Sequence, residues 1–289
     1  MEQSGFFSPL GEPSADILEV VCESVSGPYQ VLRGSKDGKI RVYRALKPQF
    51  RGDPIYEALL RKEYGIGYTL SHPGICQTIS FVKHPEEGSC IEMEWVDGVT
   101  LDTYLASRHD KGELHRIECQ LCDAVSYMHS RQVIHRDLKP SNIMVTHNGH
   151  NVKIIDFSLA DADSYSVFKQ PAGTRRYAAP ELSGNGASRA DSRCDIWSLG
   201  VILSDMGAPS RIVSRCCAED PEKRCQDALE VKAALERYRQ RRKTSRVVLV
   251  ASAVALAAVV LALTCHNVLS ERLMREATDL IEETITSRP

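Results

Sequence analysis

The sequence has no excess of basic residues. Lysine and arginine number 36 and aspartate and glutamate 38, which leaves a formal net charge of −2 at pH 7. Proteins that bind nucleic acid use a basic surface to neutralise phosphates, so this balance gives no support for a nucleic-acid partner. The 289 residues suffice for one large domain or two small ones with a sizeable core.

The sequence also lacks the marks of a secretory signal and of a zinc ribbon. Its first residues, MEQSGFFSPLGEPSAD, have neither a cationic start nor an apolar run. The ten cysteines are scattered, and the single C-x-x-C of Cys119 and Cys122 has no second pair. Both cysteines follow a helical pattern with Leu121 and Val125, which favours buried helix cysteines. A reducing cytosol fits these features best.

No internal repeat is found, and one apolar run is the only low-complexity tract. It reads VVLVASAVALAAVVLALTC, residues 247–265, and contains no charged residue. Its 19 residues are enough for a helix to cross a bilayer. A buried helix of a soluble core would show a polar stripe, which this run does not have. We therefore predict one membrane-spanning helix.

Charged residues are distributed unequally around the predicted span. Six Lys or Arg lie in RYRQRRKTSR, residues 237–246, whereas the tail, residues 266–289, has three Arg among five acids. Positive charge next to a span stays on the cytoplasmic side. We expect a single-pass protein of the cell membrane with its C-terminus outside. Apolar residues at roughly helical spacing in the tail leave two alternatives open, self-association through the span or tail and a frayed amphipathic end.

The rest of the chain combines strand patterns with helix patterns. The runs KIRVYRAL and SCIEMEWV alternate as strands do, and both precede Asp102. The later runs RIECQLCDAVSYMHS and CDIWSLGVILSDM have helical periodicity. The sequence predicts an α+β fold with a small β-rich part followed by a larger helical part.

Three polar segments follow one another in the second part. HRDLKPSN, residues 135–142, places Asp137, Lys139 and Asn142 on a predicted loop; VKIIDFS carries Asp156 at the end of an apolar strand, and GTRRYAAPE ends at Glu181. A capped polar turn could account for the first segment alone. Together and in this order, the three segments resemble the eukaryotic-type (Hanks-type) serine/threonine protein kinase family, bacterial membrane-anchored type. The resemblance covers about residues 20–236.

The resemblance implies a two-lobed protein kinase-like fold, with ATP and Mg²⁺ (or Mn²⁺) as cofactors and proteins as substrates. Asp137 is expected to accept or orient the proton of the substrate hydroxyl, with Lys139 beside the γ-phosphate. Asn142 and Asp156 are expected to hold the metal, because amide and carboxylate oxygens suit a hard cation. In having lysine at position 139, the sequence resembles the serine/threonine kinases of the family rather than its tyrosine kinases.

The resemblance also implies a set of nucleotide contacts. Lys47 in VYRALKP is expected to contact the α- and β-phosphates and to pair with a glutamate on the next helix, Glu63, with Glu57 as the competitor. The segment IEMEWVDGVTLDTYL is similar to the hinge between the lobes, with Met93 as gatekeeper. The complete expected set is Val31, Ala45, Lys47, Glu63, Met93, Glu94 and Val96.

Two departures from the family pattern concern glycine. The glycine-rich loop maps onto SVSGPYQV, with Ser24, Ser26 and Tyr29 at the three glycine positions. These side chains predict a stiffer and more distant phosphate cover and weak ATP affinity, unless Gly27 shifts the register. Ser158 replaces the glycine of DFG, at a cost on the order of 1 kcal/mol in any glycine-like conformation, so the switching of Phe157 is expected to be restricted.

A third departure is a short connection between DIWSLGVIL and DPEKRC, where the family places another helix and long loops. The helical lobe is therefore expected to be trimmed, without a surface for docking substrates. Within DPEKRC, Arg224 is expected to form a buried ion pair with Glu181.

The leading hypothesis is a membrane-anchored serine/threonine kinase that transfers the γ-phosphate of ATP to protein hydroxyls. The main alternative is a pseudokinase that acts as a partner-binding signalling module, and a small-molecule phosphotransferase is a third. The expected domains are an N-terminal segment (1–19), a kinase domain (20–236), a basic juxtamembrane linker (237–246), a transmembrane helix (247–265) and an extracytoplasmic tail (266–289).

Overall fold

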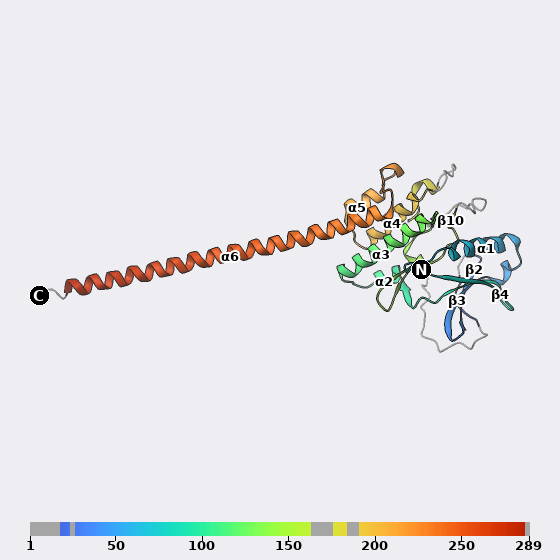
Figure 1. Ribbon diagram of the computed structural model, residues 1–289, viewed down its shortest axis with the longest axis horizontal. Helices are drawn as coiled ribbons and strands as arrows, with labels where there is room; N and C mark the ends of the chain where they lie inside the picture. Colours follow the sequence, from blue (N-terminus) through green and yellow to red (C-terminus); the bar gives the residue numbers. More distant parts are fainter. Residues whose placement is uncertain (1–17, 24–26, 163–175, 184–190, 287–289) are drawn as a thin grey trace. The chain divides into compact units, whose positions relative to one another are not determined.

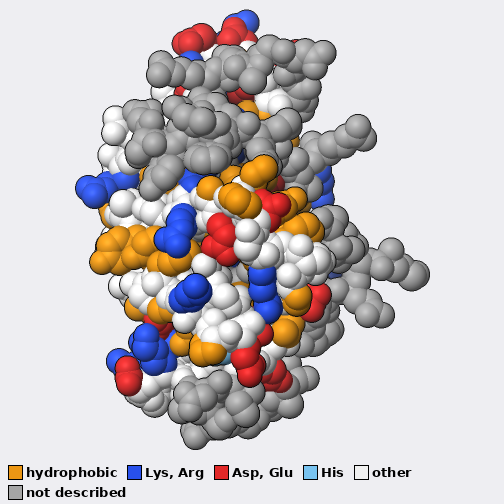
Figure 2. All heavy atoms as spheres, turned by 90° about the vertical axis from the view of Figure 1, so that its right-hand side faces the viewer, with side chains coloured by type: hydrophobic (Ala, Val, Ile, Leu, Met, Phe, Trp, Pro, Cys, Tyr) orange, Lys and Arg blue, Asp and Glu red, His pale blue; other side chains and the backbone are white. Residues whose placement is uncertain are grey.

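The structure is a computed structural model that describes residues 18–23, 27–162, 176–183 and 191–286. It contains two compact units, Met1–Leu235 and Glu236–Pro289. On the face of the first unit seen in Figure 2, basic and acidic side chains are interspersed with apolar ones, in keeping with the near-neutral charge of the sequence.

The first lobe of the first unit is built on a five-stranded antiparallel sheet (Figure 1). The strand order is β1 (Glu19–Glu23), β2 (Tyr29–Lys36), β3 (Lys39–Leu46), β5 (Gly88–Glu94) and β4 (Thr78–His84). The predicted strand KIRVYRAL is β3 over its whole length. Because strand side chains alternate between faces, Leu46 and Ile91 pack toward Leu60, while Leu32 and Cys90 form a cluster of their own.

Helix α1, Pro54–Tyr68, packs against β3, β4 and β5. The side chain of Asp53 caps its first turn, and a proline at the first position suits the helix start. Glu63 lies on the buried face of the helix. Gly67 lies so close to Thr78 that an added Cβ would be 2.4 Å from its hydroxyl oxygen. A glycine is therefore needed where α1 meets β4.

The second lobe is mainly helical, as predicted. Its helices are α2 (Leu101–Leu105), α3 (Lys111–Ser130), α4 (Arg193–Asp205) and α5 (Ser210–Cys216). Its strands are β6 (Gly98–Thr100), β7 (Val133–Ile134), β8 (Ile143–Thr146), β9 (Val152–Ile154) and β10 (Asp161–Ala162). Short 3₁₀ turns are η1 (Pro48–Phe50), which lies between β3 and α1 of the first lobe, and η2 (Pro140–Asn142), η4 (Pro180–Ser183) and η5 (Pro221–Lys223) of the second. The predicted helices RIECQLCDAVSYMHS and CDIWSLGVILSDM lie in α3 and α4.

The core of this lobe lies between α3 and α4. Leu121 and Val125 of α3 and Leu199 and Ile202 of α4 are fully buried in one cluster. Cys122 of the C-x-x-C segment is buried in the same cluster, so it packs as a core residue. Residues 206–220 contain one short helix, α5, which agrees with the expectation of a trimmed lobe.

Helix α6 runs without interruption from Ala228 to Thr286. Ala228, Val231 and Leu235 are buried in the core of the first unit. The following turns contain the basic segment and the apolar run. The side chains of the apolar run, residues 247–265, are exposed. Among the helices of the described residues, α6 alone is long and apolar enough to cross a membrane. The predicted linker, span and tail thus share one helix rather than forming separate elements.

Candidate active site

The HRDLKPSN segment is a loop between β7 and β8, and it brings three predicted residues together. Lys139 Nζ donates to Asp137 Oδ2 at 2.7 Å. Asn142 Nδ2 donates to the backbone oxygen of Asp137 at 2.9 Å and to its Oδ2 at 3.2 Å. The Asp137 carboxylate is therefore fixed in orientation by two neighbours on its own loop.

Asp195 on α4, which the sequence analysis did not single out, positions this loop. Its fully buried carboxylate accepts hydrogen bonds from the backbone amides of His135 and Arg136, at 2.8 and 2.9 Å, and from Nε2 of His129 at 2.9 Å. Burial acts to raise the pKa of Asp195, but the hydrogen bond and charge of His129 outweigh it and hold the pKa below its usual range. An acidic residue within the apolar segment CDIWSLGVIL is the signal that could have identified it.

Asp156 follows β9 and has a left-handed backbone, with φ at 67°. Its Oδ1 accepts a hydrogen bond from the amide of Ser158 at 3.1 Å. Phe157 is buried, and its ring lies 5.3 Å from that of His135. Ser158 is not among the non-glycine residues with positive φ in the described chain. The backbone strain expected at Ser158 is therefore located at Asp156 in this conformation.

The cation beside Glu63 is Arg44 and not the predicted Lys47. Arg44 Nε lies 3.1 Å from Glu63 Oε2, and Arg44 Nη2 lies 3.1 Å from Asp156 Oδ1. Lys47 follows Arg44 by three residues, and an odd separation in extended chain turns two side chains to opposite faces. The expected pair of Lys47 with Glu63 is thereby corrected to Arg44 with Glu63. The glutamate of α1 in this cluster is Glu63 rather than Glu57.

Arg44 and Glu63 of this cluster are buried, whereas the Asp156 side chain is 28% exposed, and the cluster is only partly hydrogen-bonded. Arg44 Nε and Glu63 Oε2 have no hydrogen-bond partner, so their contact is electrostatic. Burial raises the pKa of Glu63 to about 7; the charge of Arg44 opposes this rise and that of Asp156 adds to it. At Asp156, burial acts to raise the pKa, but Arg44 and hydrogen bonds from Ser158 hold it below its usual range. The guanidinium thus stabilises Asp156 more than Glu63.

Tyr29 covers the guanidinium of Arg44. The Arg44 Cζ atom lies 4.5 Å from the centroid of the Tyr29 ring, a cation–π distance. Burial raises the pKa of the Tyr29 hydroxyl, and the charge of Glu63 adds to this effect. The tyrosine at the third glycine position therefore fills space that a glycine would leave open. Ser24 and Ser26 lie outside the described residues.

Strand register places two of the expected nucleotide contacts, Val31 and Ala45, on opposite faces of the sheet. Val31 lies directly opposite Arg44 across β2 and β3, so both face the same side of the sheet. Ala45, the next residue, faces the other side, where it is fully buried in a cluster with Leu32. Ala45 therefore faces away from Arg44 and Glu63. Val42 precedes Arg44 by two residues and therefore lies on the same face of β3, as the nucleotide contact expected of Ala45 requires.

The expected hinge follows β5. Met93 lines a small cavity together with Glu63 and Asp156. Val96 is buried in a cluster with Met144 of β8, against which Met93 packs. Met144 was not predicted, although it follows Asn142 by two residues. The Glu94 side chain accepts hydrogen bonds from Lys153 Nζ at 2.6 Å and from the Gln77 amide at 2.8 Å, and the Glu94 amide donates to the Gln77 carbonyl at 3.0 Å.

Two oxygen-bearing residues, Asn142 and Asp156, fit a hard divalent cation. The Nδ2 atom of Asn142 points at Asp137, which turns its Oδ1 elsewhere. The described residues contain no group of three His, Cys, Asp or Glu that could hold a metal by themselves. Mg²⁺ is commonly held by one or two protein oxygens together with substrate phosphates and water, so this small donor set is sufficient.

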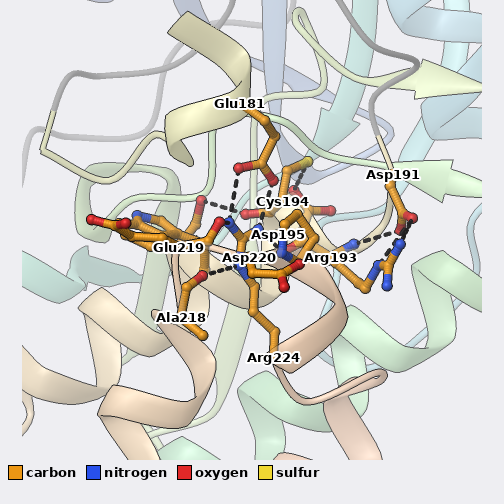
Figure 3. Close-up of polar contacts among 12 residues, drawn as sticks. Glu181, Asp191, Arg193, Cys194, Asp195, Ala218, Glu219, Asp220 and Arg224 are labelled. Carbon is orange, nitrogen blue, oxygen red and sulfur yellow. Dashed lines mark hydrogen bonds and ion pairs between the residues drawn. The ribbon is translucent and has the colours of Figure 1, made fainter.

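Below the loop, Glu181 of η4 and Arg224 form the predicted ion pair (Figure 3). The contact is bidentate, with Nη1–Oε1 at 2.6 Å and Nη2–Oε2 at 2.8 Å. Arg224 is fully buried and also donates to the carbonyls of Ala218 and Arg193. The pair links the APE segment to the end of the lobe. The candidate phosphorylation sites Ser164, Tyr165, Ser166 and Thr174 lie outside the described residues.

Comparisons with known proteins agree with this arrangement. Residues 30–289 match the family described as protein kinase domain. The chain belongs to this family. The kinase domain is 31% identical over 209 residues to serine/threonine-protein kinase PrkC of Bacillus subtilis, covering 65% of this chain and 31% of that protein. It is 34% identical over 206 residues to probable serine/threonine-protein kinase PknB of Lactococcus lactis, covering 68% of this chain and 32% of that protein. The chain thus spans about a third of the length of these relatives.

Proposed function

We propose that this chain is an ATP-dependent serine/threonine protein kinase that phosphorylates proteins at a membrane. The observation that carries the proposal is the fixed carboxylate of Asp137, held by Lys139 and Asn142 on a loop anchored at Asp195. A carboxylate in a set orientation can accept the proton of an incoming hydroxyl, which phosphoryl transfer requires of its protein.

The other polar residues have complementary roles. Lys139 supplies positive charge beside the γ-phosphate, and Arg44 takes the α- and β-phosphate contact that was expected of Lys47. Asn142 and Asp156 would hold Mg²⁺, with Mn²⁺ as the alternative. Bound metal would neutralise charge on the phosphate oxygens. Val31, Met93 and Val96, with the backbone of Glu94, enclose the adenine.

The membrane part of the proposal rests on α6. Its apolar run, residues 247–265, would span the bilayer once, with the kinase domain (20–236) and basic linker (237–246) in the cytoplasm and the tail (266–289) outside. Among the described residues, α6 is the one candidate span, and its length and composition support this location. Self-association would use the span or the tail.

A pseudokinase is the second candidate, and one observation favours it. Arg44 contacts Asp156, and Tyr29 lies on Arg44, so the described conformation has a cation of its own beside the proposed metal ligand. A chain fixed in this state would bind partners without transferring phosphate.

An assay of phosphate transfer from labelled ATP in the presence of Mg²⁺ distinguishes a protein kinase from a pseudokinase and from a small-molecule phosphotransferase. The chain in detergent is incubated with a generic protein substrate, with a sugar and with an aminoglycoside. We expect label on the protein alone, and loss of that label in Asp137→Asn but not in Asp37→Asn, the same change in an exposed turn. Label on the small molecules would indicate a small-molecule phosphotransferase, and no label on any substrate would indicate a pseudokinase.

A further inference from the structure

One oxygen of the proposed metal ligand Asp156 is already in contact with a cation. Arg44 Nη2 lies 3.1 Å from Asp156 Oδ1, and the Arg44 side chain is 10% exposed. Two positive charges repel strongly where water is scarce, so a divalent ion and the guanidinium compete for the same carboxylate. In this structure, Arg44 therefore occupies the Asp156 carboxylate that a metal ion would otherwise be able to bind.

The position of Arg44 is set on three sides. The Tyr29 ring lies over the guanidinium at 4.5 Å, Glu63 lies beside Nε, and Asp156 lies beside Nη2. Tyr29 is at the start of β2, directly opposite Leu46 at the end of β3. Because β2 and β3 are paired along their whole length, the tyrosine is held over Arg44 by the sheet itself. The contact between Tyr29 and Arg44 thus depends on the pairing of β2 with β3.

The cluster is incompletely satisfied in this state. Arg44 Nε and Glu63 Oε2 are buried and have no hydrogen-bond partner. Buried polar atoms without partners are uncommon in native proteins and call for an explanation, such as a ligand that completes them. A phosphate group offers the planar guanidinium several oxygens in bidentate geometry, which Glu63 does not provide here.

We propose that Arg44 is an internal counter-ion that keeps divalent metal off Asp156 until nucleotide phosphates draw the guanidinium away. Tyr29 holds Arg44 in place while the nucleotide is absent. Metal and nucleotide then bind together rather than independently. This inference rests on the proposed nucleotide site, but it does not require that phosphate be transferred.

The test measures Mn²⁺ binding to the full chain in detergent without nucleotide, from the electron paramagnetic resonance signal of free Mn²⁺. Arg44→Met removes the counter-ion and should tighten Mn²⁺ binding at least tenfold. Tyr29→Leu should tighten it by a smaller factor. Arg41→Met is the matched control, since Arg41 lies in the same strand but pairs with Glu92, and it should bind Mn²⁺ as the parent does. The double variant Arg44→Met/Asp156→Asn should lose the gain.

A second measurement separates this effect from damage to the fold. Binding of a fluorescent ATP analogue in EDTA should weaken about tenfold in Arg44→Met, because the phosphates lose their cation. A damaged fold would weaken both ligands, whereas the proposal predicts opposite changes for metal and nucleotide. If Arg44→Met alone does not fold, Arg44→Met/Glu63→Gln removes the unpaired carboxylate and is measured in its place.

Equal Mn²⁺ affinity in the parent and the folded Arg44 variant overturns the proposal, as does a gain that persists without the Asp156 carboxylate. Absence of nucleotide binding by the parent in EDTA also overturns it. Neither measurement includes phosphate transfer, so a chain that fails as a kinase can still satisfy this test. The two proposals therefore fail by different results.

Discussion

Asp195 shows how one buried residue can position a loop that carries the proposed catalytic base. Three nitrogen donors converge on its carboxylate, two of them backbone amides of the HRDLKPSN loop. In Asp195→Asn the charge is lost, and one oxygen is replaced by a donor that faces other donors. We expect the free energy of unfolding to fall by about 2–4 kcal/mol. Chemical unfolding of the variant beside Asp37→Asn, an exposed control, measures this loss.

The same residue predicts a pH dependence. The pKa of Asp195 is lower in the folded chain than the unfolded value of about 3.9. Its stabilising effect is therefore complete above that unfolded value and is lost as the pH falls toward the folded pKa. The difference in unfolding free energy between the parent and Asp195→Asn should be constant between pH 7 and 5 and shrink below about pH 4. A difference that instead grows on acidification would contradict this assignment.

Replacement by methionine should affect nucleotide binding differently at Arg44 and at Lys47. Arg44 contacts Asp156, whereas Lys47 lies beyond the end of β3. Lys47→Met should therefore change the affinity for an ATP analogue less than twofold, while Arg44→Met should weaken it about tenfold, which corresponds to 1.4 kcal/mol. Fluorescence titration of the two variants decides between them. The reverse order of affinities would restore Lys47 to the phosphate site.

Residue type alone could not place these side chains. The motifs indicated Asp137, Lys139 and Asn142 because these residues lie on one loop, and short sequence distance fixes them in space. The structure departs from the expectation at Lys47 and Ala45, which followed the identity of a lysine and not the alternation of β3. Arg44 is the residue of this strand that faces Glu63, and Ala45 faces the other side of the sheet. Tyr29 and Met144 were missed as contacts because the residues that they contact, Arg44 and Val96, lie in other segments of the chain.

At the scale of elements, the Glu181–Arg224 pair joins η4 to the end of the lobe. Arg224 is fully buried, whereas the Glu181 side chain is 26% exposed, so the pair lies between a surface contact and a dry one. Glu181→Ala and Arg224→Ala should each lower the unfolding free energy by about 2–3 kcal/mol. Glu222→Ala, at an exposed position nearby, should change it by less than about 0.5 kcal/mol. Two variants that melt like the parent would refute a structural role for the pair.

Element boundaries followed well from sequence where the pattern was local. The alternation of KIRVYRAL gave β3, and helical periodicity located α3 and α4. The continuity of α6 was not predicted, because composition divides residues 228–286 into a polar, a basic, an apolar and a charged part. Helix formation depends on backbone hydrogen bonds within the segment and can pass through all four.

At the scale of the whole molecule, α6 predicts a defined topology. Six basic residues precede the apolar run, so the kinase domain should lie in the cytoplasm, where ATP is available. Protease added outside intact cells, after permeabilisation of any outer membrane, should remove a C-terminal tag and spare the kinase domain. Replacing the six basic residues 237–246 by glutamine should weaken this preference. A protected tag together with a digested kinase domain would show the inverted orientation.

Phosphoryl transfer from ATP to Ser or Thr is tested most directly by the phosphoamino-acid content of a protein substrate after incubation with the full chain, labelled ATP and Mg²⁺. Asp137 should be required, because its carboxylate is the group that we propose accepts the proton of the substrate hydroxyl. We predict labelled phosphoserine or phosphothreonine with the parent chain and none with Asp137→Asn. An unlabelled substrate, or equal label with the parent and Asp137→Asn, would contradict the account.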